Sequence, residues 1–248
     1  MMKRSCLVVI AALTSTGCSG TDVGNPSVDV RAALVAVDFP EEGASEPGSA
    51  RARIQQAWIS VDRIRMRPAS NCEGDAELEL EGPFALDLFA EDQPEQLAGL
   101  AFAATDYCRF EFRWAPEDDP IGGAPEELSG ASLFLAGEKQ DGTAFVVRST
   151  RNDELRLRAV DNAFTVDQST THLFLTFTGT ELFSNVSFAE AEVDEDGVVR
   201  IEPGSNEELL DAFEASLEET VRLFEDTDSD GRLSDSEANP EDALAESE

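Results

Sequence analysis

The amino-acid sequence predicts a mainly β protein, an antiparallel β-sandwich over residues 27–180 followed by a small C-terminal helix. Two observations support this prediction. Short runs of β-prone residues recur across this region, separated by Gly, Pro, Asn and Asp. No stretch of the region keeps a helical period over three turns, so a parallel α/β sheet is not expected. A β-barrel is the alternative architecture.

The individual strands are predicted from alternation of apolar and polar side chains. In residues 108–114 four apolar residues alternate with three charged ones, which is typical of a half-buried strand. Asp141-Gly142 lies between two apolar runs and predicts a hairpin turn. Further strands are expected within residues 28–39, 54–66, 78–88, 155–158, 164–166 and 170–178.

Composition limits the class of protein. The chain has 248 residues, 41% of them hydrophobic, enough for one core with or without a small appendage. Acidic residues number 52 against 18 Lys plus Arg, a net charge of -34, and such a surface excludes nucleic acid as a partner. Residues 190–248 hold 22 of the acids and three arginines. This step predicts a separate module over residues 186–240 and a disordered acidic tail over residues 241–248.

The N-terminus has the features of a targeting signal. A basic start, Met1–Arg4, precedes a short apolar run, Leu7–Leu13, which predicts a signal peptide over residues 1–17. The Gly17-Cys18 step resembles the cleavage junction of bacterial lipoproteins, although Ser15 stands where that family usually has Leu. The resemblance implies a lipid on Cys18, a flexible tether over residues 18–26 and, from Ser19, an outer-membrane location. Ordinary signal cleavage near Gly17 is the alternative.

The remaining cysteines fit an exported protein. Cys6 would leave with the signal peptide and Cys18 would carry the lipid. Cys72 and Cys108 are then a single pair in an oxidising compartment, where a disulfide is expected. Two buried free thiols are the alternative.

The predicted C-terminal helix begins at Ser205. Ser205–Glu208 fits a capping box, in which the Ser and Glu side chains satisfy each other's backbone N–H groups. Apolar residues then follow at intervals of four or three and form the stripe of an amphipathic helix. These residues are Leu209, Phe213, Leu217, Val221 and Phe224.

Residues 226–237 resemble the calcium-binding loop of EF-hand proteins. Asp226, Asp228, Asp230, Arg232, Ser234 and Glu237 occupy the six ligand positions, Arg232 through its carbonyl, and Gly231 stands at the turn. Phe224 departs from the family, whose incoming helix places an aromatic residue immediately before the loop. Asp194–Gly197 lacks the final Glu and is predicted as a hairpin turn. A lone loop of this kind implies a structural calcium clip with a dissociation constant of roughly 10⁻⁴ to 10⁻³ M.

Three further segments resemble a group of bacterial surface lipoproteins of uncharacterised function: Gly20–Pro26, Trp58–Arg67 and Leu86–Leu88. The resemblance implies a β-sandwich that binds a partner or has a structural role, without naming a ligand.

Catalysis is not expected. The chain has one histidine, His172, and no nucleophile elbow, zinc-binding His pair or phosphate-binding Gly-rich loop. The sequence therefore predicts a calcium-binding, lipid-anchored protein of the cell envelope that acts as a binding module for a protein or glycan, or as a structural module. The alternative is a glycan-directed envelope hydrolase that uses two carboxylates and holds a structural calcium.

Overall fold

A computed structural model describes residues 24–39, 52–90, 94–119, 122–234 and 236–248. It is mainly β, with 44% strand and 14% helix. The strands are β1 (Ser27–Val35), β2 (Asp38–Phe39), β3 (Ala52–Pro68), β4 (Leu78–Asp87), β5 (Leu100–Ala101), β6 (Thr105–Trp114), β7 (Leu133–Lys139), β8 (Ala144–Ser149), β9 (Glu154–Ala159), β10 (Phe164–Val166), β11 (His172–Thr178), β12 (Val199–Ile201), β13 (Arg222–Glu225) and β14 (Ala245–Ser247). The α-helices are α1 (Gly179–Leu182) and α2 (Glu207–Thr220), and short 3-10 turns occupy Ala69–Asn71, Glu95–Leu97, Glu126–Leu128 and Pro240–Asp242.

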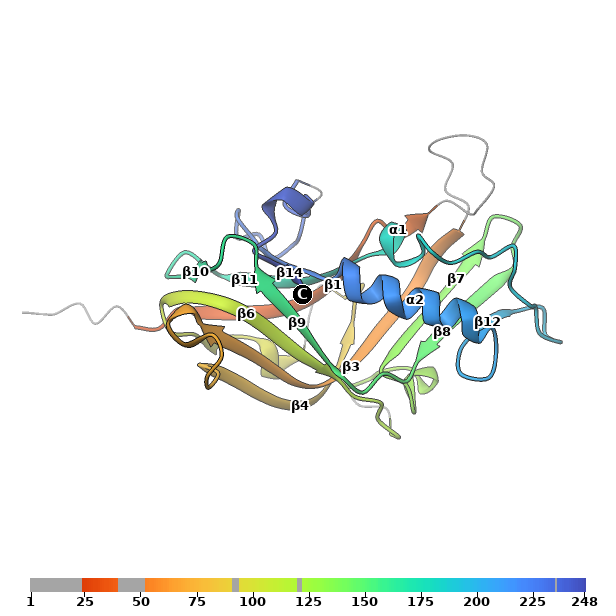
Figure 1. The fold of residues 1–248 in the computed structure, drawn as a ribbon, viewed down its shortest axis with the longest axis horizontal. Coiled ribbons are helices and arrows are strands. Elements are labelled where there is room, and N and C mark those ends of the chain that lie inside the picture. The colour runs from red at the N-terminus through yellow and green to blue at the C-terminus, as the bar shows by residue number, and fades with distance from the viewer. Residues whose placement is uncertain (1–23, 40–51, 91–93, 120–121, 235) are drawn as a thin grey trace, which may run out of the picture.

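The strands of the described residues form a single curled sheet (Figure 1). Its order is β12-β8-β7-β3-β6-β9-β14-β13-β11-β1-β5, with β10 added to β6 and with β2 and β4 added to β3. Most neighbours are antiparallel, but β1 pairs with β11 and β12 with β8 in parallel. The sheet is thus a mixed half-barrel, and the predicted antiparallel two-sheet sandwich is not seen. Alternation specifies one buried face for each strand, which a curled sheet and a sandwich satisfy equally.

Strand β3 causes much of the curl. Its first half pairs with β7, and its second half lies between β4 and β6. The register shifts between Val61 and Arg63 against both β4 and β6. A bulge of this kind bends a strand and increases its twist, which turns the sheet at the point where the partners change.

The core lies inside the curl. Buried apolar residues from β1 through β14 form one cluster, and Phe213 and Leu217 of α2 belong to it. Helix α2 lies across one face of the sheet (Figure 1). On β6 the cluster includes Tyr107 as well as Phe110, which are three residues apart, and the register against β3 shifts between Arg67 and Pro68 beside them.

The C-terminal segment is integrated into this sheet. Strand β14 lies between β13 and β9, and Ala245 is fully buried. The predicted disordered tail over residues 241–248 is therefore wrong for the part that forms β14. Its acidic composition hid the strand, because the two buried alanines, Ala243 and Ala245, give only a weak apolar signal.

Helix α2 is shorter than predicted and begins differently. It ends at Thr220, and Val221 and Phe224 belong to an extended segment that pairs with β11. The N-cap residue of α2, Asn206, has a positive φ of 53°. Its side chain forms hydrogen bonds with the backbone of Glu192 and Arg200. The predicted capping box at Ser205 is therefore not formed. Tertiary pairing has overridden the local helical pattern.

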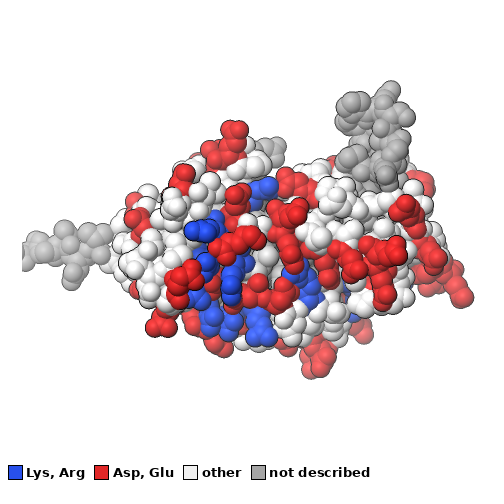
Figure 2. All heavy atoms as spheres, viewed as in Figure 1, with Lys and Arg blue, Asp and Glu red and all other residues white. Residues whose placement is uncertain are grey.

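Acidic side chains cover much of the surface, as Figure 2 shows for one face. A band of basic side chains interrupts them over β3, β6 and β9. The band consists of Arg63, Arg65, Arg67, Arg109, Arg113, Arg156 and Arg158, each within 4.0 Å of an Asp or Glu oxygen. It is a lattice of alternating charges on the outer face of the sheet.

Candidate metal centre

The twelve-residue segment 226–237 connects strand β13 to the turn that precedes β14. Asp226 follows β13 directly, and its N–H donates to the carbonyl of His172 on β11 at 3.2 Å. The chain therefore enters this segment from a strand of the sheet, whereas the sequence predicted entry from a helix. On its far side, the N–H groups of Glu237 and Ala238 both donate to the carbonyl of Ser234 at 3.0 Å, which closes a single turn.

Three of the four predicted carboxylate ligands come together. Oxygens of Asp226, Asp228 and Glu237 all lie within 4.8 Å of one another. Asp230 is outside this group: its Oδ1 accepts the N–H of Arg232 at 2.8 Å. Ser234 lies beside the group, because its hydroxyl donates to Glu237 Oε2 at 2.8 Å.

Hydrogen bonds from the backbone shape the loop around Asp226. Asp226 Oδ1 accepts the N–H of Ser229 at 2.6 Å, and Oδ2 accepts the N–H of Gly231 at 2.8 Å. Gly231 has a φ of 80°, a conformation that residues with a Cβ adopt at a cost. Each carboxylate oxygen has two lone pairs, so Asp226 Oδ1 can accept the Ser229 N–H and still face a cation.

Glu237 closes the loop from the opposite end. Its Oε1 accepts the N–H of Thr227 at 2.8 Å, and its Oε2 accepts the N–H of Ser234 at 3.0 Å. The pKa of Glu237 is lowered to about 2, and the hydrogen bond from the Ser234 N–H is the largest cause. The hydroxyls of Ser234 and Thr227 lower it further, whereas desolvation opposes the shift. Glu237 is thus an ionised carboxylate near neutral pH.

Asp228 shows the repulsion between the gathered carboxylates. The N–H of Asp230 lowers the pKa of Asp228, but desolvation and the negative charges of Asp230 and Glu237 outweigh that bond, so the pKa is raised. A cation among these oxygens would relieve the repulsion. The donor set is hard carboxylate and hydroxyl oxygen, which suits calcium better than zinc or copper.

Sequence reasoning missed the residues that hold the loop against the sheet. His172 Nδ1 lies 2.9 Å from Asp226 Oδ2, and Arg31 Nη1 donates to the carbonyl of Gly231 at 2.5 Å. Asp29 lies beside both, 3.4 Å from Arg31 Nη2 and 3.6 Å from His172 Nε2. Their sequence positions are far from the loop, and only the parallel pairing of β1 with β11 brings them together. No local pattern signals that pairing.

The predicted disulfide is confirmed. Cys72 and Cys108 are bonded, with their Cα atoms 6.0 Å apart, within the usual range for a disulfide. The bond ties the turn after β3 to strand β6. Cys18, the predicted lipid site, lies outside the described residues, as do the signal peptide and most of the tether. Within the parts of the chain that are described, none of the helices is both long and apolar enough to cross a membrane.

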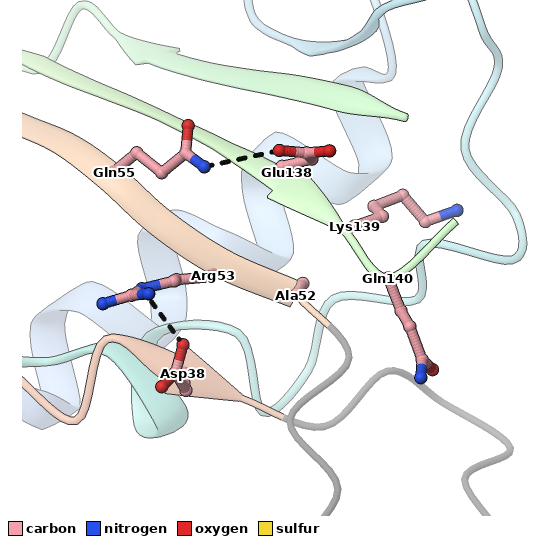
Figure 3. A pocket seen from close by; sticks show the side chains of 7 residues that line it. All are labelled: Asp38, Ala52, Arg53, Gln55, Glu138, Lys139 and Gln140. Carbon is pink, nitrogen blue, oxygen red and sulfur yellow. Dashed lines mark hydrogen bonds and ion pairs between the residues drawn. The ribbon is translucent and has the colours of Figure 1, made fainter. Parts of the chain in front are cut away.

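The hydrolase alternative requires two close carboxylates in unlike environments. Figure 3 shows a surface depression lined by seven residues, two of them acidic: Asp38, Ala52, Arg53, Gln55, Glu138, Lys139 and Gln140. Asp38 lies 3.4 Å from Arg53, and Glu138 accepts a hydrogen bond from Gln55 at 3.4 Å. Both carboxylates are exposed. Neither has the apolar surroundings that keep a general acid protonated.

A second depression lies beside the start of β9, and four acidic residues line it: Asp153, Glu154, Glu218 and Glu248. The hydrogen bond from Arg151 chiefly lowers the pKa of Asp153. Burial raises the pKa of Glu154, but bonds from Arg156 and Arg63 outweigh it and lower the pKa overall. Both groups are shifted in the same direction, away from the protonated form that a general acid needs. Neither the Asp38 and Glu138 pair nor the Asp153 and Glu154 pair therefore favours hydrolysis.

Comparison of the chain with models of known protein families, with curated proteins and with solved structures found no significant match in any of the three. The residues and geometry described above are therefore the basis for assigning a function.

Proposed function

We propose that this protein is a calcium-binding, lipid-anchored module of the cell envelope, in which the loop 226–237 is a structural calcium clip. The observation that carries the proposal is the convergence of Asp226, Asp228 and Glu237 oxygens in a loop with EF-hand ligand spacing. Arg232 through its carbonyl, together with Asp230 and Ser234, would complete the six positions. Cys18 would hold the domain at the membrane, in keeping with its place directly after the predicted signal peptide.

The curled sheet would be the structural or partner-binding body. The net charge of -34 disfavours nucleic acid and anionic lipid surfaces and leaves a protein or glycan as the partner. The same charge concentrates cations around the molecule, which favours occupancy of a weak calcium site.

The calcium claim is tested by titration of the purified protein. A loop with a dissociation constant of about 10⁻⁴ M would stabilise the fold by about 2.7 kcal/mol at 10 mM calcium. For a chain of this length that corresponds to a rise in melting temperature of about 5–10 °C. Heat release should titrate over the same range of calcium concentration.

The variant Glu237→Gln should lose this response, because the amide offers one neutral oxygen in place of a bidentate carboxylate. Glu241→Gln removes the same charge outside the loop and is the matched control, expected to respond like the wild type. An unchanged response in Glu237→Gln, or no response in the wild type up to 10 mM calcium, would refute the proposal.

Lipidation is tested separately. Wild-type protein isolated from cells grown with labelled palmitate should carry the label, and the Cys18→Ser protein isolated in the same way should not. Equal labelling of the two proteins would remove the membrane anchor from the proposal and leave the calcium site untouched.

A further inference from the structure

Two side chains, Arg31 and His172, contact the loop 226–237 from the strands beneath it, and Asp29 lies beside both of them. Asp29 and Arg31 are on β1, and His172 is on β11. Asp29 is the register partner of His172 in the parallel pair, so these side chains occupy neighbouring positions at one end of the two strands. We call Asp29, Arg31 and His172 the loop bracket.

The bracket contacts the loop where its metal-binding geometry is set. Gly231 is held on both sides: its N–H donates to Asp226 Oδ2 at 2.8 Å, and its carbonyl accepts Arg31 Nη1 at 2.5 Å. A Cβ on Gly231 would lie 3.4 Å from Arg31 Nη1, which shows how closely the strand and the loop approach. His172 Nδ1 lies 2.9 Å from the same Oδ2 of Asp226.

Asp29 extends the bracket to the next strand. Its Oδ1 accepts the N–H of Gly99 at 2.7 Å, immediately before β5, and its Oδ2 lies 3.4 Å from Arg31 Nη2. A continuous set of polar contacts therefore runs from the candidate ligand Asp226 through Gly231 and Arg31 to Asp29. Arg31 and His172 are both mostly buried, with side chains 19% and 15% exposed, so these contacts are only partly screened by water.

Strand β1 is the element on which this contact has most effect. It lies near one end of the sheet, paired with β11 over seven residues but with β5 over only two. It is also the strand to which the N-terminal segment carrying Cys18 is joined. A load on a tether at Cys18 would be borne first by β1.

We propose that calcium binding in the loop fastens strand β1 to the body of the protein through the loop bracket, with Arg31 as the positioning residue. The inference rests on the proposed calcium site, and it adds a coupling between that site and strand β1. The bound cation would fix Asp226 and the peptide that follows Gly231, and this fixed peptide would hold Arg31. By linkage, β1 in its place would strengthen calcium binding by the same factor.

The experiment is amide hydrogen exchange on the full chain in detergent micelles, with and without 10 mM calcium. In the wild type we expect calcium to slow exchange in residues 28–35 by about 10- to 100-fold, the factor for a site with the proposed affinity. Residues 144–149 of β8, remote from the loop in the strand order, provide the internal reference. They should slow less, which separates fastening of β1 from a rise in global stability.

Arg31→Gln removes the charged clamp on Gly231. We expect it to weaken calcium binding by roughly 5- to 150-fold, the usual size of such couplings, and to abolish the selective slowing of β1 at saturating calcium. Arg31→Lys, which retains a donor for the Gly231 carbonyl, should restore part of both effects. Arg53→Gln is the matched control, because it removes an exposed arginine from another strand and should behave like the wild type.

The outcomes separate the two proposals. If calcium slows exchange in the loop 226–237 but leaves β1 no slower than β8 in the wild type, the coupling is refuted and the calcium site stands. The coupling is refuted as well if Arg31→Gln retains both wild-type affinity and selective slowing. If no segment responds to calcium, the calcium site itself is refuted. The wild-type measurement alone is decisive if Arg31→Gln does not fold.

Discussion

Glu111 is a fully buried carboxylate on the outer face of the sheet, beneath the arginine band. Its side chain is 1% exposed, and its Oε1 lies 2.7 Å from Arg67 Nε and 3.8 Å from Arg109 Nη1. Removal of one partner from a buried ion pair leaves uncompensated charge. The charged lattice on this face therefore has a buried centre at Glu111 as well as a solvated periphery.

Glu111→Ala should therefore lower the free energy of unfolding by about 3–5 kcal/mol, measured by urea denaturation. Glu79→Gln is the control, because Glu79 pairs with Arg65 at 2.7 Å but is 39% exposed, and such a pair contributes about 1 kcal/mol or less. Equal effects of the two substitutions would show that burial does not distinguish them.

The lowered pKa of Asp194 predicts that this residue contributes to the loss of stability of the fold in acid. The N–H of Val198 chiefly lowers its pKa, and Arg200 Nε, at 2.6 Å, adds to the lowering. A carboxyl whose folded-state pKa is depressed stabilises the fold above its ordinary pKa of 3.8 and loses that contribution as the pH falls through the depressed value. The wild type should thus lose stability with acid below about pH 4.

Asp194→Asn should lose less stability than the wild type over that interval, because Asn can still accept the Val198 N–H but does not titrate. Chemical denaturation at pH 7 and at several values below pH 4 measures the difference. If the unfolding free energy fell equally with pH in the two proteins, Asp194 would not contribute to the acid sensitivity.

At the scale of the element, the disulfide fastens the turn that follows β3. Cys72 and Cys108 are 36 positions apart in the sequence, so the bond closes a long loop of the unfolded chain. The double variant Cys72→Ala/Cys108→Ala should lose about 2–5 kcal/mol of unfolding free energy. Reductant should destabilise the wild type by a similar amount and leave the double variant unaffected. The prediction would be contradicted if reductant did not change the unfolding free energy of the wild type measured in denaturant.

Helix α2 shows where local sequence signals succeed and where they stop. The amphipathic stripe predicts that Leu209, Phe213 and Leu217 face the core, and all three are buried. The same period continues through Val221 and Phe224, yet these residues lie in and before β13, because pairing with β11 favours the extended form. A helix-to-strand change of this kind depends on a partner that lies some 50 residues away in the sequence, and helical periodicity cannot report it.

At the scale of the whole molecule, β14 completes the sheet. Ala245 is fully buried between β13 and β9, whereas Glu246 is exposed on the other face. Ala245→Asp would bury an unpaired carboxylate and should cost on the order of 3 kcal/mol or more of unfolding free energy. Glu246→Ala should change stability by less than about 0.5 kcal/mol. Two equally harmless substitutions would mean that this segment does not belong to the sheet.

The mainly β class, the hairpin at Asp141-Gly142 and the cysteine pair followed from the sequence, because alternation, turn chemistry and cysteine arithmetic are local or compositional signals. The curled, mixed sheet did not follow, since it depends on β3 changing partners and on two parallel pairs between distant segments. The same limit applies to the candidate site. The ligand spacing of residues 226–237 is written in twelve consecutive positions, but Arg31 and His172 reach the loop only through the fold.

The position of β14 also limits when the sheet can form during synthesis of the chain. The sheet between β9 and β13 lacks its middle strand until residues 245–247 have been synthesised, and β1 must wait for β11, more than 130 residues later. At ordinary rates of translation this delay is on the order of 10 s or more. Such high contact order means that the nascent chain cannot complete its sheet progressively from the N-terminus. Closure of the sheet must therefore wait at least until residues 245–247 have been synthesised.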